Sequence, residues 1–355
     1  MSQRDVPDLS VSEAVETYIK RKRPDWKGGT ERTYRRNLEL FVEYAGEREI
    51  ERVDALTRWE AGGFTDWLLE QDYAPASVAS RQKAVKTWIR WLESQGLVEH
   101  GLHTAIETLR LTEDEQTSNQ QLEPADAKAL LTFYRDSAEW RGTRRHVVLE
   151  LLWHIGCRAS GLLALDLGDY DRDAGDLRFR NRPEKGTRLK EGLTHERDVT
   201  ISATPQDVLD LYLTRERFSV RDEYGREPLI TSQAGRPTED TLRYWTYEAT
   251  QPCMCQECPH GKRRPNCEWV PRKQASKCPS TRSPHPIRRG SITWQRNLGF
   301  SSETVAERVA ATPNVIRRYY DQPDHAAELE RRRADTETID ITEHLSPTDL
   351  EVSES

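Results

Sequence analysis

Residues that can act together on a phosphate group occur at defined spacings in this sequence. His285 and Arg288 are three positions apart at the start of a predicted helix, so they lie on one face of it, and a Ser-Pro pair just before them is typical of a helix entrance. Tyr320 follows in Val-Ile-Arg-Arg-Tyr-Tyr-Asp, and Arg158 precedes them in Gly-Cys-Arg-Ala-Ser-Gly-Leu-Leu. A guanidinium binds two phosphate oxygens and stays charged, and a tyrosine hydroxyl can act as a nucleophile. The four residues form a candidate site for phosphoryl transfer.

The order Arg…His-x-x-Arg…Tyr resembles the signature of the tyrosine recombinases, the phage-integrase family. The segment that begins at Gly156 resembles the family's first box, Gly-x-Arg-x-Ser-Glu-Leu followed by Leu-x-x-x-Asp. The resemblance covers residues 10–325. It implies an enzyme that cleaves and rejoins DNA strands through a covalent bond between a 3′ phosphate and a tyrosine.

The resemblance also implies roles for the candidate residues. Arg158 and Arg288 would neutralise the charge of the pentavalent transition state, and His285 would accept a proton or hydrogen-bond to the phosphate. Tyr320 would be the nucleophile, with the adjacent Tyr319 as the alternative. The phosphotyrosyl bond conserves bond energy, so the reaction is reversible and catalysis needs no cofactor.

The family's general acid is a lysine in a β-hairpin, and Lys190 fits this position best, with Lys185 as the alternative. Two family residues have no counterpart at the expected positions. Gly161 replaces the acidic residue of the first box, so a different group must orient Arg158. The histidine or tryptophan that usually lies nine residues before the nucleophile falls on Ala311 counted from Tyr320.

A cysteine-rich segment at 253–278 precedes the His-x-x-Arg helix. Five of the six cysteines lie there, and in a chain without a secretion signal this pattern favours metal binding over disulfides. Structural zinc takes four ligands, and the preferred set is Cys253, Cys258, Cys267 and Cys278. Cys255 and His260 are alternative ligands. A cysteine-rich insert at this position resembles integrases of haloarchaea and their viruses. Its zinc would hold the folded insertion together without taking part in catalysis.

Composition limits the class of protein. The net charge is −7, but Arg outnumbers Lys 42 to 11 among the 53 basic residues, which favours bidentate phosphate contacts over a uniformly basic surface. The acidic, lysine-poor composition fits a high-salt archaeal cytoplasm, and GC-rich coding explains it equally well. No apolar run is long enough for a membrane span, and the first residues have no signal-peptide core. We therefore expect a cytoplasmic protein without membrane contact.

Apolar periodicity predicts a mostly α protein with a small antiparallel β-sheet. Four helices are predicted, the first at 11–22. The second of the four is capped by Thr30, and the third carries Trp59 and Phe64. These four helices would form an all-α domain that resembles the core-binding, SAM-like domain of the family. Its basic residues recur beside helix starts, where they could follow a duplex backbone. The predicted organisation is a flexible N-terminus at 1–10, a core-binding domain at 11–110, a linker at 111–121, a catalytic domain at 122–325, and a C-terminal helix and acidic tail at 326–355.

Within the second domain, a buried helix is predicted from Arg144 to His154, just before Arg158. Alternating residues predict strands at 177–182 and 197–201, with the lysine-bearing hairpin loop between them. The expected function is integration or excision of a mobile element or virus at a double-stranded DNA attachment site, by a dimer on each site and a tetramer in the synapse. The alternatives are an Xer-type resolvase of chromosome or plasmid dimers, and a regulatory or architectural DNA-binding protein with a decayed site.

Overall fold

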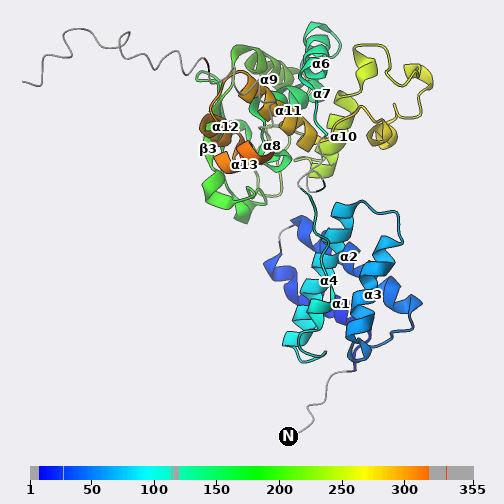
Figure 1. Cartoon of the computed structure of the whole chain (residues 1–355). Coiled ribbons are helices and arrows are strands. Elements are labelled where there is room, and N and C mark those ends of the chain that lie inside the picture. The colour runs from blue at the N-terminus through cyan, green and yellow to red at the C-terminus, as the bar shows by residue number, and fades with distance from the viewer. Residues whose placement is uncertain (1–7, 27, 113–114, 116–119, 320–332, 334–355) are drawn as a thin grey trace, which may run out of the picture. The chain divides into compact units, whose positions relative to one another are not determined.

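The computed structural model describes residues 8–26, 28–112, 115, 120–319 and 333. The chain divides into two compact units, Met1–Asn119 and Gln120–Ser355 (Figure 1). Each unit has a hydrophobic core of its own. Among the described residues, no helix is long and apolar enough to cross a membrane.

The first unit is helical, as predicted. Its main helices are α1 (Val11–Lys22), α2 (Gly28–Glu47), α3 (Arg58–Leu69) and α4 (Pro75–Ser94). Ser10 and Thr57 begin α1 and α3 with capping boxes, each pairing with a glutamate three residues later. The predicted cap at Thr30 is wrong, because α2 already begins at Gly28 and continues through Gly46. The apolar stripe of α2 packs strongly enough to carry the helix across a residue that disfavours helix by about 1 kcal/mol.

Aromatic side chains fill the core of this unit. Phe41 contacts Phe64 and Trp88 edge-to-face, with ring centroids 5.1 and 5.3 Å apart, and each such pair adds about 0.5–1.5 kcal/mol beyond its buried area. Trp59 does not join them: it is 87% exposed at the start of α3. The apolar stripe of α3 therefore begins at Ala61 rather than at Trp59.

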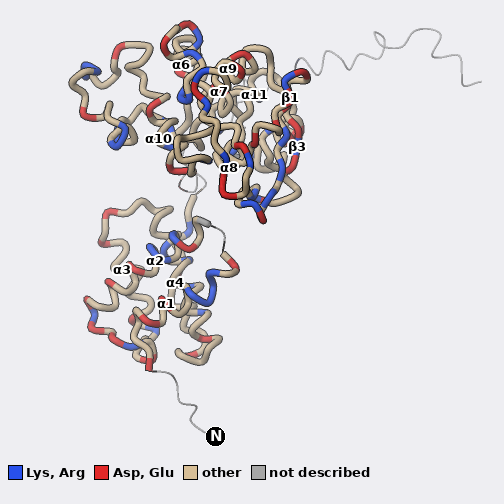
Figure 2. Tube along the Cα trace, turned by 180° about the vertical axis from the view of Figure 1, so that it is seen from behind, with Lys and Arg blue, Asp and Glu red and all other residues tan. Residues whose placement is uncertain are grey.

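Basic and acidic residues are interspersed over the surface of both units (Figure 2). Some of the basic residues expected to follow a DNA backbone pair with acids: Arg23 donates to Glu31, and Arg35 pairs with Glu16. Exposed pairs of this kind contribute about 0–1 kcal/mol each. They exchange readily for a phosphate partner, so they do not exclude nucleic-acid contact.

The second unit is mostly helical with a small sheet, again as predicted. Its helices are α6 (Pro124–Asp136), α7 (Arg144–Ile155), α8 (Ala159–Ala164), α9 (Ala203–Arg215), α10 (Glu239–Ala249), α11 (Pro284–Asn297), α12 (Ser302–Val309) and α13 (Pro313–Tyr319). The antiparallel sheet has the order β1 (Tyr170–Asp171), β2 (Asp176–Phe179) and β3 (Arg197–Thr200). In its register, Leu177 pairs with Tyr170 on one side and with Val199 on the other, and all three side chains are buried.

Helix α7 lies at the centre of this unit, with α6, α9, α10 and α11 packed around it. Its predicted apolar residues, including Val147 and Leu151, are fully buried. Full burial of each large apolar side chain contributes about 1.5–3 kcal/mol, so α7 is firmly held. A side chain just beyond its C-terminus is therefore placed by the most rigid element of the unit.

Helix α11 is tied to the first residues of the unit. The backbone N–H of Leu122 donates to the carbonyl of Pro286, 3.1 Å away. Gly290 faces this contact, and a Cβ atom there would lie 2.0 Å from the Leu122 carbonyl oxygen. Only glycine allows this close approach. The approach fixes the first turns of α11, which carry His285 and Arg288.

Candidate active site

A turn at Gly156 places Arg158 beside the C-terminal end of α12. Helix α7 ends at Gly156, whose φ of 71° is left-handed and whose added Cβ would meet Ser291 and Val309 at 3.0 Å, so the position requires glycine. Arg158 follows as the N-cap residue of α8. Its Nη1 donates to the carbonyl of Ala310, 2.6 Å away.

Arg288 is anchored to the neighbouring carbonyl. Its side chain is almost fully buried, and Nη1 donates to the carbonyls of Val309, 2.6 Å away, and Gly156, 2.7 Å away. The partial negative charge at the C-terminus of α12 favours both arginines. Among the described residues, Nη2 of Arg288 is buried and has no hydrogen-bond partner. A buried donor left unsatisfied costs about 1–3 kcal/mol, and a bound anion would remove that cost.

A small pocket lies beside these arginines, and we call it the cation pocket. Its lining residues are Arg158, Ser160, Gly161, Leu189, Lys190, His195, Arg197, Val309 and Ala310. None of these residues is acidic. Its surface therefore presents several positive charges and no carboxylate, which suits a phosphate group.

Lys190 is the lysine that the structure brings to Arg158. It is exposed in the loop between β2 and β3, and its ammonium has no ion pair or hydrogen bond among the described residues. Lys185, the alternative, does not line the pocket. Its backbone carbonyl instead accepts from Arg226, 3.0 Å away, at the base of the loop.

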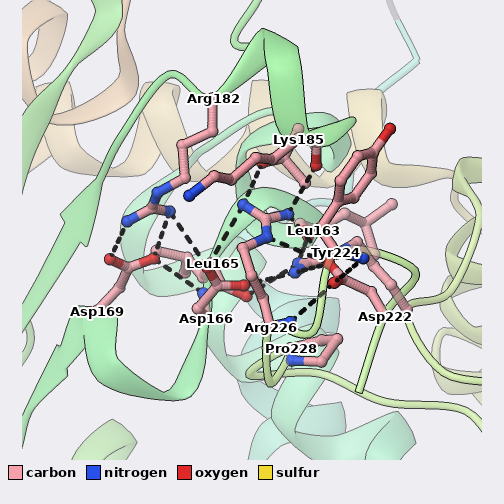
Figure 3. A network of polar contacts seen from close by, with 12 residues as sticks. Leu163, Leu165, Asp166, Asp169, Arg182, Lys185, Asp222, Tyr224, Arg226 and Pro228 are labelled. Atoms are coloured by element: carbon pink, nitrogen blue, oxygen red, sulfur yellow. Dashed lines mark hydrogen bonds and ion pairs between the residues drawn. The ribbon is translucent and has the colours of Figure 1, made fainter. Parts of the chain in front are cut away.

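A network of arginines and aspartates holds this loop, and we call it the hairpin clamp (Figure 3). Its charged members are Asp166, Asp169, Arg182, Asp222, Arg226 and Arg236. Arg182 donates to both carboxylate oxygens of Asp169, at 2.9 and 2.6 Å. Arg226 joins Asp222 to the loop through the Thr187 hydroxyl, 2.8 Å away. The clamp thus fixes the base of the loop that carries Lys190.

The clamp perturbs Asp222 strongly. Burial alone raises the pKa of its carboxyl group, but hydrogen bonds from Arg236 and Arg226 outweigh burial and lower the pKa to about 2. The backbone N–H groups of Tyr224 and Arg226 also donate to this carboxylate, at 3.0 and 2.9 Å. Asp222 is therefore ionised at neutral pH.

His285 lies within the electrostatic reach of the pocket. Its side chain is exposed on one side and crowded by protein on the other. This partial burial lowers its pKa, and so do Arg288, Arg289, Arg158 and Lys190. Among the described residues the ring has no hydrogen-bond partner. A neutral imidazole beside the arginines can accept a proton near neutral pH.

Tyr320 lies outside the described residues. Helix α13, which ends at Tyr319, packs on α12 through Ile316, a fully buried residue beside Val309. Tyr319, the alternative nucleophile predicted from the sequence, is the last residue of this helix, which lies next to the carbonyls that bind Arg158 and Arg288. The choice between Tyr319 and Tyr320 stays a prediction.

Comparisons with known proteins agree with this arrangement. Residues 27–96 match the family model "Phage integrase, N-terminal SAM-like domain". The chain is 26% identical over 210 residues to tyrosine recombinase XerC of Herpetosiphon aurantiacus, covering 59% of this chain and 64% of the relative. It is 26% identical over 193 residues to tyrosine recombinase XerD of Listeria innocua, covering 54% and 60%. The chain is similar to tyrosine recombinases over these regions. The aligned regions span less than two thirds of the length of these relatives.

Solved structures of integrases show the same fold as this chain. The Tn1549 transposon integrase, in complex with a circular intermediate DNA, has a TM-score of 0.64 at 14% identity, covering 92% of this chain and 99% of that chain. A lambda integrase dimer bound to a COC′ core site has a TM-score of 0.58 at 13% identity, covering 91% and 77%. At these identities the likeness concerns the fold alone.

Gly161 stands where the first box of the tyrosine recombinases has an acidic residue. A Cβ at Gly161 would make ordinary contacts with the Phe179 ring, at 3.6 Å, and with the Cys157 Cβ, at 4.0 Å, so the site has room for a side chain but holds none. The carbonyl of Ala310 accepts a hydrogen bond from Arg158. A backbone carbonyl at the end of α12 thus performs a task that the sequence pattern assigns to an acidic residue.

Sequence reasoning missed two residues of the cation pocket, His195 and Arg197. The Arg197 guanidinium lies over the Phe179 ring, 3.9 Å from its centroid, and donates to the carbonyl of Arg308, 2.7 Å away. Burial lowers the pKa of Arg197 to about 10. Both residues follow Lys190 closely in the same hairpin, and this proximity in sequence is a signal that could have indicated them. The sequence alone does not show which hairpin residues face the site.

The cysteine-rich segment does not form the predicted zinc site. Among the described residues, no three histidine, cysteine or acidic side chains are placed to hold a metal ion, and all six cysteines are free. The Cys253 thiol accepts from Arg264, 3.1 Å away, and burial raises the pKa of the Cys278 thiol. The residues as placed do not fit a zinc ion.

Proposed function

We propose that this chain is a site-specific DNA recombinase, an integrase that cleaves and rejoins DNA strands through a 3′-phosphotyrosyl intermediate on Tyr320. One observation carries the proposal: Arg158 and Lys190 line a pocket free of carboxylates, beside His285 and the buried Arg288. The unpartnered Nη2 of Arg288 supports an anionic ligand there. The similarity to tyrosine recombinases supports DNA as the source of that anion.

In the proposed reaction, the Tyr320 oxygen bonds to the scissile phosphorus as the bond to the 5′ oxygen breaks. Arg158 and Arg288 bind the nonbridging oxygens, whose negative charge grows in the transition state. Lys190 gives a proton to the leaving 5′ oxygen, and neutral His285 takes the proton of Tyr320 or hydrogen-bonds to the phosphate. Attack by another 5′ hydroxyl reverses the chemistry on a new strand, and no cofactor is consumed.

The proposed partners are a double-stranded DNA attachment site and further copies of this chain, as a dimer on each site and a tetramer in the synapse. DNA-bound integrase structures share the fold, which supports the DNA partner. We expect the two units to bind DNA independently, the first through its exposed basic residues. A cytoplasmic location and an archaeal source stay predictions of the sequence.

A second candidate function, resolution of chromosome or plasmid dimers, is favoured by the identity of the curated relatives, which are XerC and XerD recombinases. It uses the same chemistry on a different substrate. Supercoiled plasmids that carry two copies of a cleaved site distinguish the two functions. Resolution into single circles favours the Xer-type reading, and insertion of one plasmid into another favours integration.

A covalent-capture experiment tests the proposed chemistry against a protein that only binds DNA. Wild-type protein is incubated with a library of nicked duplexes of randomised sequence, in which strand loss after cleavage traps the adduct. Adducts that survive denaturing gels are recovered and sequenced. We expect a defined family of captured sequences. Retention of DNA on native gels without any covalent adduct would establish the binding-only alternative.

The structural zinc ion predicted from Cys253, Cys258, Cys267 and Cys278 is not part of this catalytic proposal. Elemental analysis of purified protein decides the matter. About one zinc per chain would support the sequence prediction. Protein that is metal-free and fully stable to heat would agree with the structure, in which the described residues form no metal-binding group.

A further inference from the structure

His195 occupies a defined place in the cation pocket. It ends a short 3-10 helix, Gly192–His195, in the loop that also carries Lys190. Arg197 donates from Nη1 to the His195 carbonyl, 3.1 Å away, and the Glu196 carboxylate accepts from the backbone N–H of Asn181, 2.8 Å away. The backbone on the C-terminal side of His195 is therefore held by two side-chain contacts.

The imidazole of His195 is available for a ligand. It is half-buried, it lines the pocket with Arg158 and Lys190, and it has no hydrogen-bond partner among the described residues. Burial and the nearby guanidinium groups, Arg158 foremost, lower its pKa, and Glu191 opposes this effect. A neutral imidazole keeps one N–H donor, so it can bind a phosphate oxygen without adding to the repulsion among the arginines.

Arg197 lies next to His195 and is held mainly by contacts within the protein. Its Nε donates to the Arg308 carbonyl and its Nη1 to the His195 carbonyl, while its guanidinium covers the Phe179 ring. These contacts make Arg197 a positioning residue for the loop. The His195 imidazole, like the Lys190 ammonium, has no hydrogen-bond partner in the part of the chain that the structure describes.

We propose that His195 is a further catalytic residue, whose imidazole N–H donates a hydrogen bond to a nonbridging oxygen of the scissile phosphate. The proposal rests on the proposed recombinase function, because it needs a phosphate in the cation pocket. It assigns His195 to stabilisation of the transition state, leaving protonation of the 5′ oxygen to Lys190. The hairpin would thus supply two groups to the reaction.

Adduct formation by His195 variants tests the proposal, using the full chain and a nicked duplex selected by covalent capture with the wild type. His195→Ala should slow the first-order formation of the adduct by about a hundredfold, the scale for one lost transition-state donor. His195→Gln keeps an N–H donor and should recover most of the rate, to within about tenfold of wild type. His100→Ala, at an exposed position of the first unit, is the matched control and should cleave like the wild type.

A second substrate separates the two possible kinds of role. Replacing the 5′ bridging oxygen by sulfur gives a leaving group that needs no protonation. This substrate should restore cleavage by Lys190→Ala but leave His195→Ala slow. Restoration of His195→Ala by sulfur would overturn the proposal, because His195 would then assist the leaving group.

The remaining outcomes also decide the matter. A His195→Ala rate within about twofold of wild type, or a Gln variant as slow as the Ala variant, would overturn the role of His195 as a donor. Thermal unfolding of each variant shows whether a slow variant is folded. Either result leaves the recombinase function intact, since the wild type must form the adduct before any variant is compared. Failure of the wild type to form an adduct would instead contradict the proposed function.

Discussion

The second unit contains two arginine-rich regions that differ in their counter-charges. In the hairpin clamp, each of the three arginines bonds to at least one aspartate. In the cation pocket, no lining residue is acidic, and Arg158 and its neighbour Arg288 are held by the backbone carbonyls of Ala310 and Val309. The clamp arginines are thus neutralised by carboxylates, whereas the hydrogen bonds of the buried Arg288 among the described residues go to backbone carbonyls.

This difference teaches how one residue type serves structure and chemistry within a single unit. A carbonyl fixes a guanidinium through a hydrogen bond but brings only a partial charge, so the full positive charge stays available to a ligand. A carboxylate fixes and also neutralises it. The clamp therefore acts as scaffold, and the pocket acts as an anion site whose loop the clamp holds in place.

The largest effect is expected from the pocket arginines. Arg158→Ala and Arg288→Ala should each slow adduct formation by about a hundredfold or more, because each removes a donor to the transition state. Single-turnover cleavage of a captured duplex measures this. Arg217→Ala is a control outside the pocket, since the Arg217 guanidinium hydrogen-bonds to the Pro228 carbonyl and does not line the pocket. Cleavage near the wild-type rate by either pocket variant would remove that arginine from the site.

The two lysines of the hairpin sharpen the comparison, because one lies at the pocket and the other at the clamp. Lys190→Ala should slow cleavage by about a hundredfold, the lower range for loss of a general acid. Lys185→Ala should change the rate little, because the clamp uses its backbone carbonyl and not its ammonium. The reverse order of effects would transfer the acid role to Lys185.

Removing a counter-charge from the clamp should affect stability more than chemistry. Asp222→Asn leaves Arg226 and Arg236 partly uncompensated, so we expect the free energy of unfolding to fall by about 3 kcal/mol. Urea unfolding of the full chain at pH 7 measures the change. Glu223→Gln, at the exposed neighbouring position, is the matched control. An Asp222→Asn protein as stable as the control would show that the clamp does not hold the loop.

The smallest expected effect is the pH dependence of the clamp. The pKa of Asp222 is lowered to about 2 in the folded protein from its ordinary 3.8. Its contribution to stability is therefore complete above about pH 4 and is lost as the pH falls toward 2. The difference in melting temperature between wild type and Asp222→Asn should shrink across this window. A difference that stays constant down to pH 2.5 would contradict the assignment of this charge to the clamp.

The sequence predicted those features that depend on local pattern. Helices α1 and α7 follow from apolar periodicity, and the start of α11 follows from its Ser-Pro entrance. The family boxes indicated Arg158 and Arg288, and the structure brings these two residues together. Their roles, and that of Tyr320, stay predictions until cleavage is measured.

The remaining features depend on contacts between segments that are far apart in the sequence. Nothing local indicates that the Ala310 carbonyl binds Arg158, or that Arg236 reaches Asp222 in the clamp. The position of His195 depends likewise on how the hairpin packs against α12. The cysteine spacing suggested convergence on a metal, but spacing alone does not specify how the loops between cysteines fold.

The most direct test of the account is to identify the residue that becomes linked to DNA. A captured adduct can be digested with nuclease and protease, and the peptide that carries the residual nucleotide can be sequenced by mass spectrometry. The account predicts the modification on Tyr320, at the 3′ end of the cleaved strand, and no adduct from Tyr320→Phe. Modification of Tyr319 with full activity of Tyr320→Phe would move the nucleophile by one residue. Modification of a residue outside this pair would contradict the account.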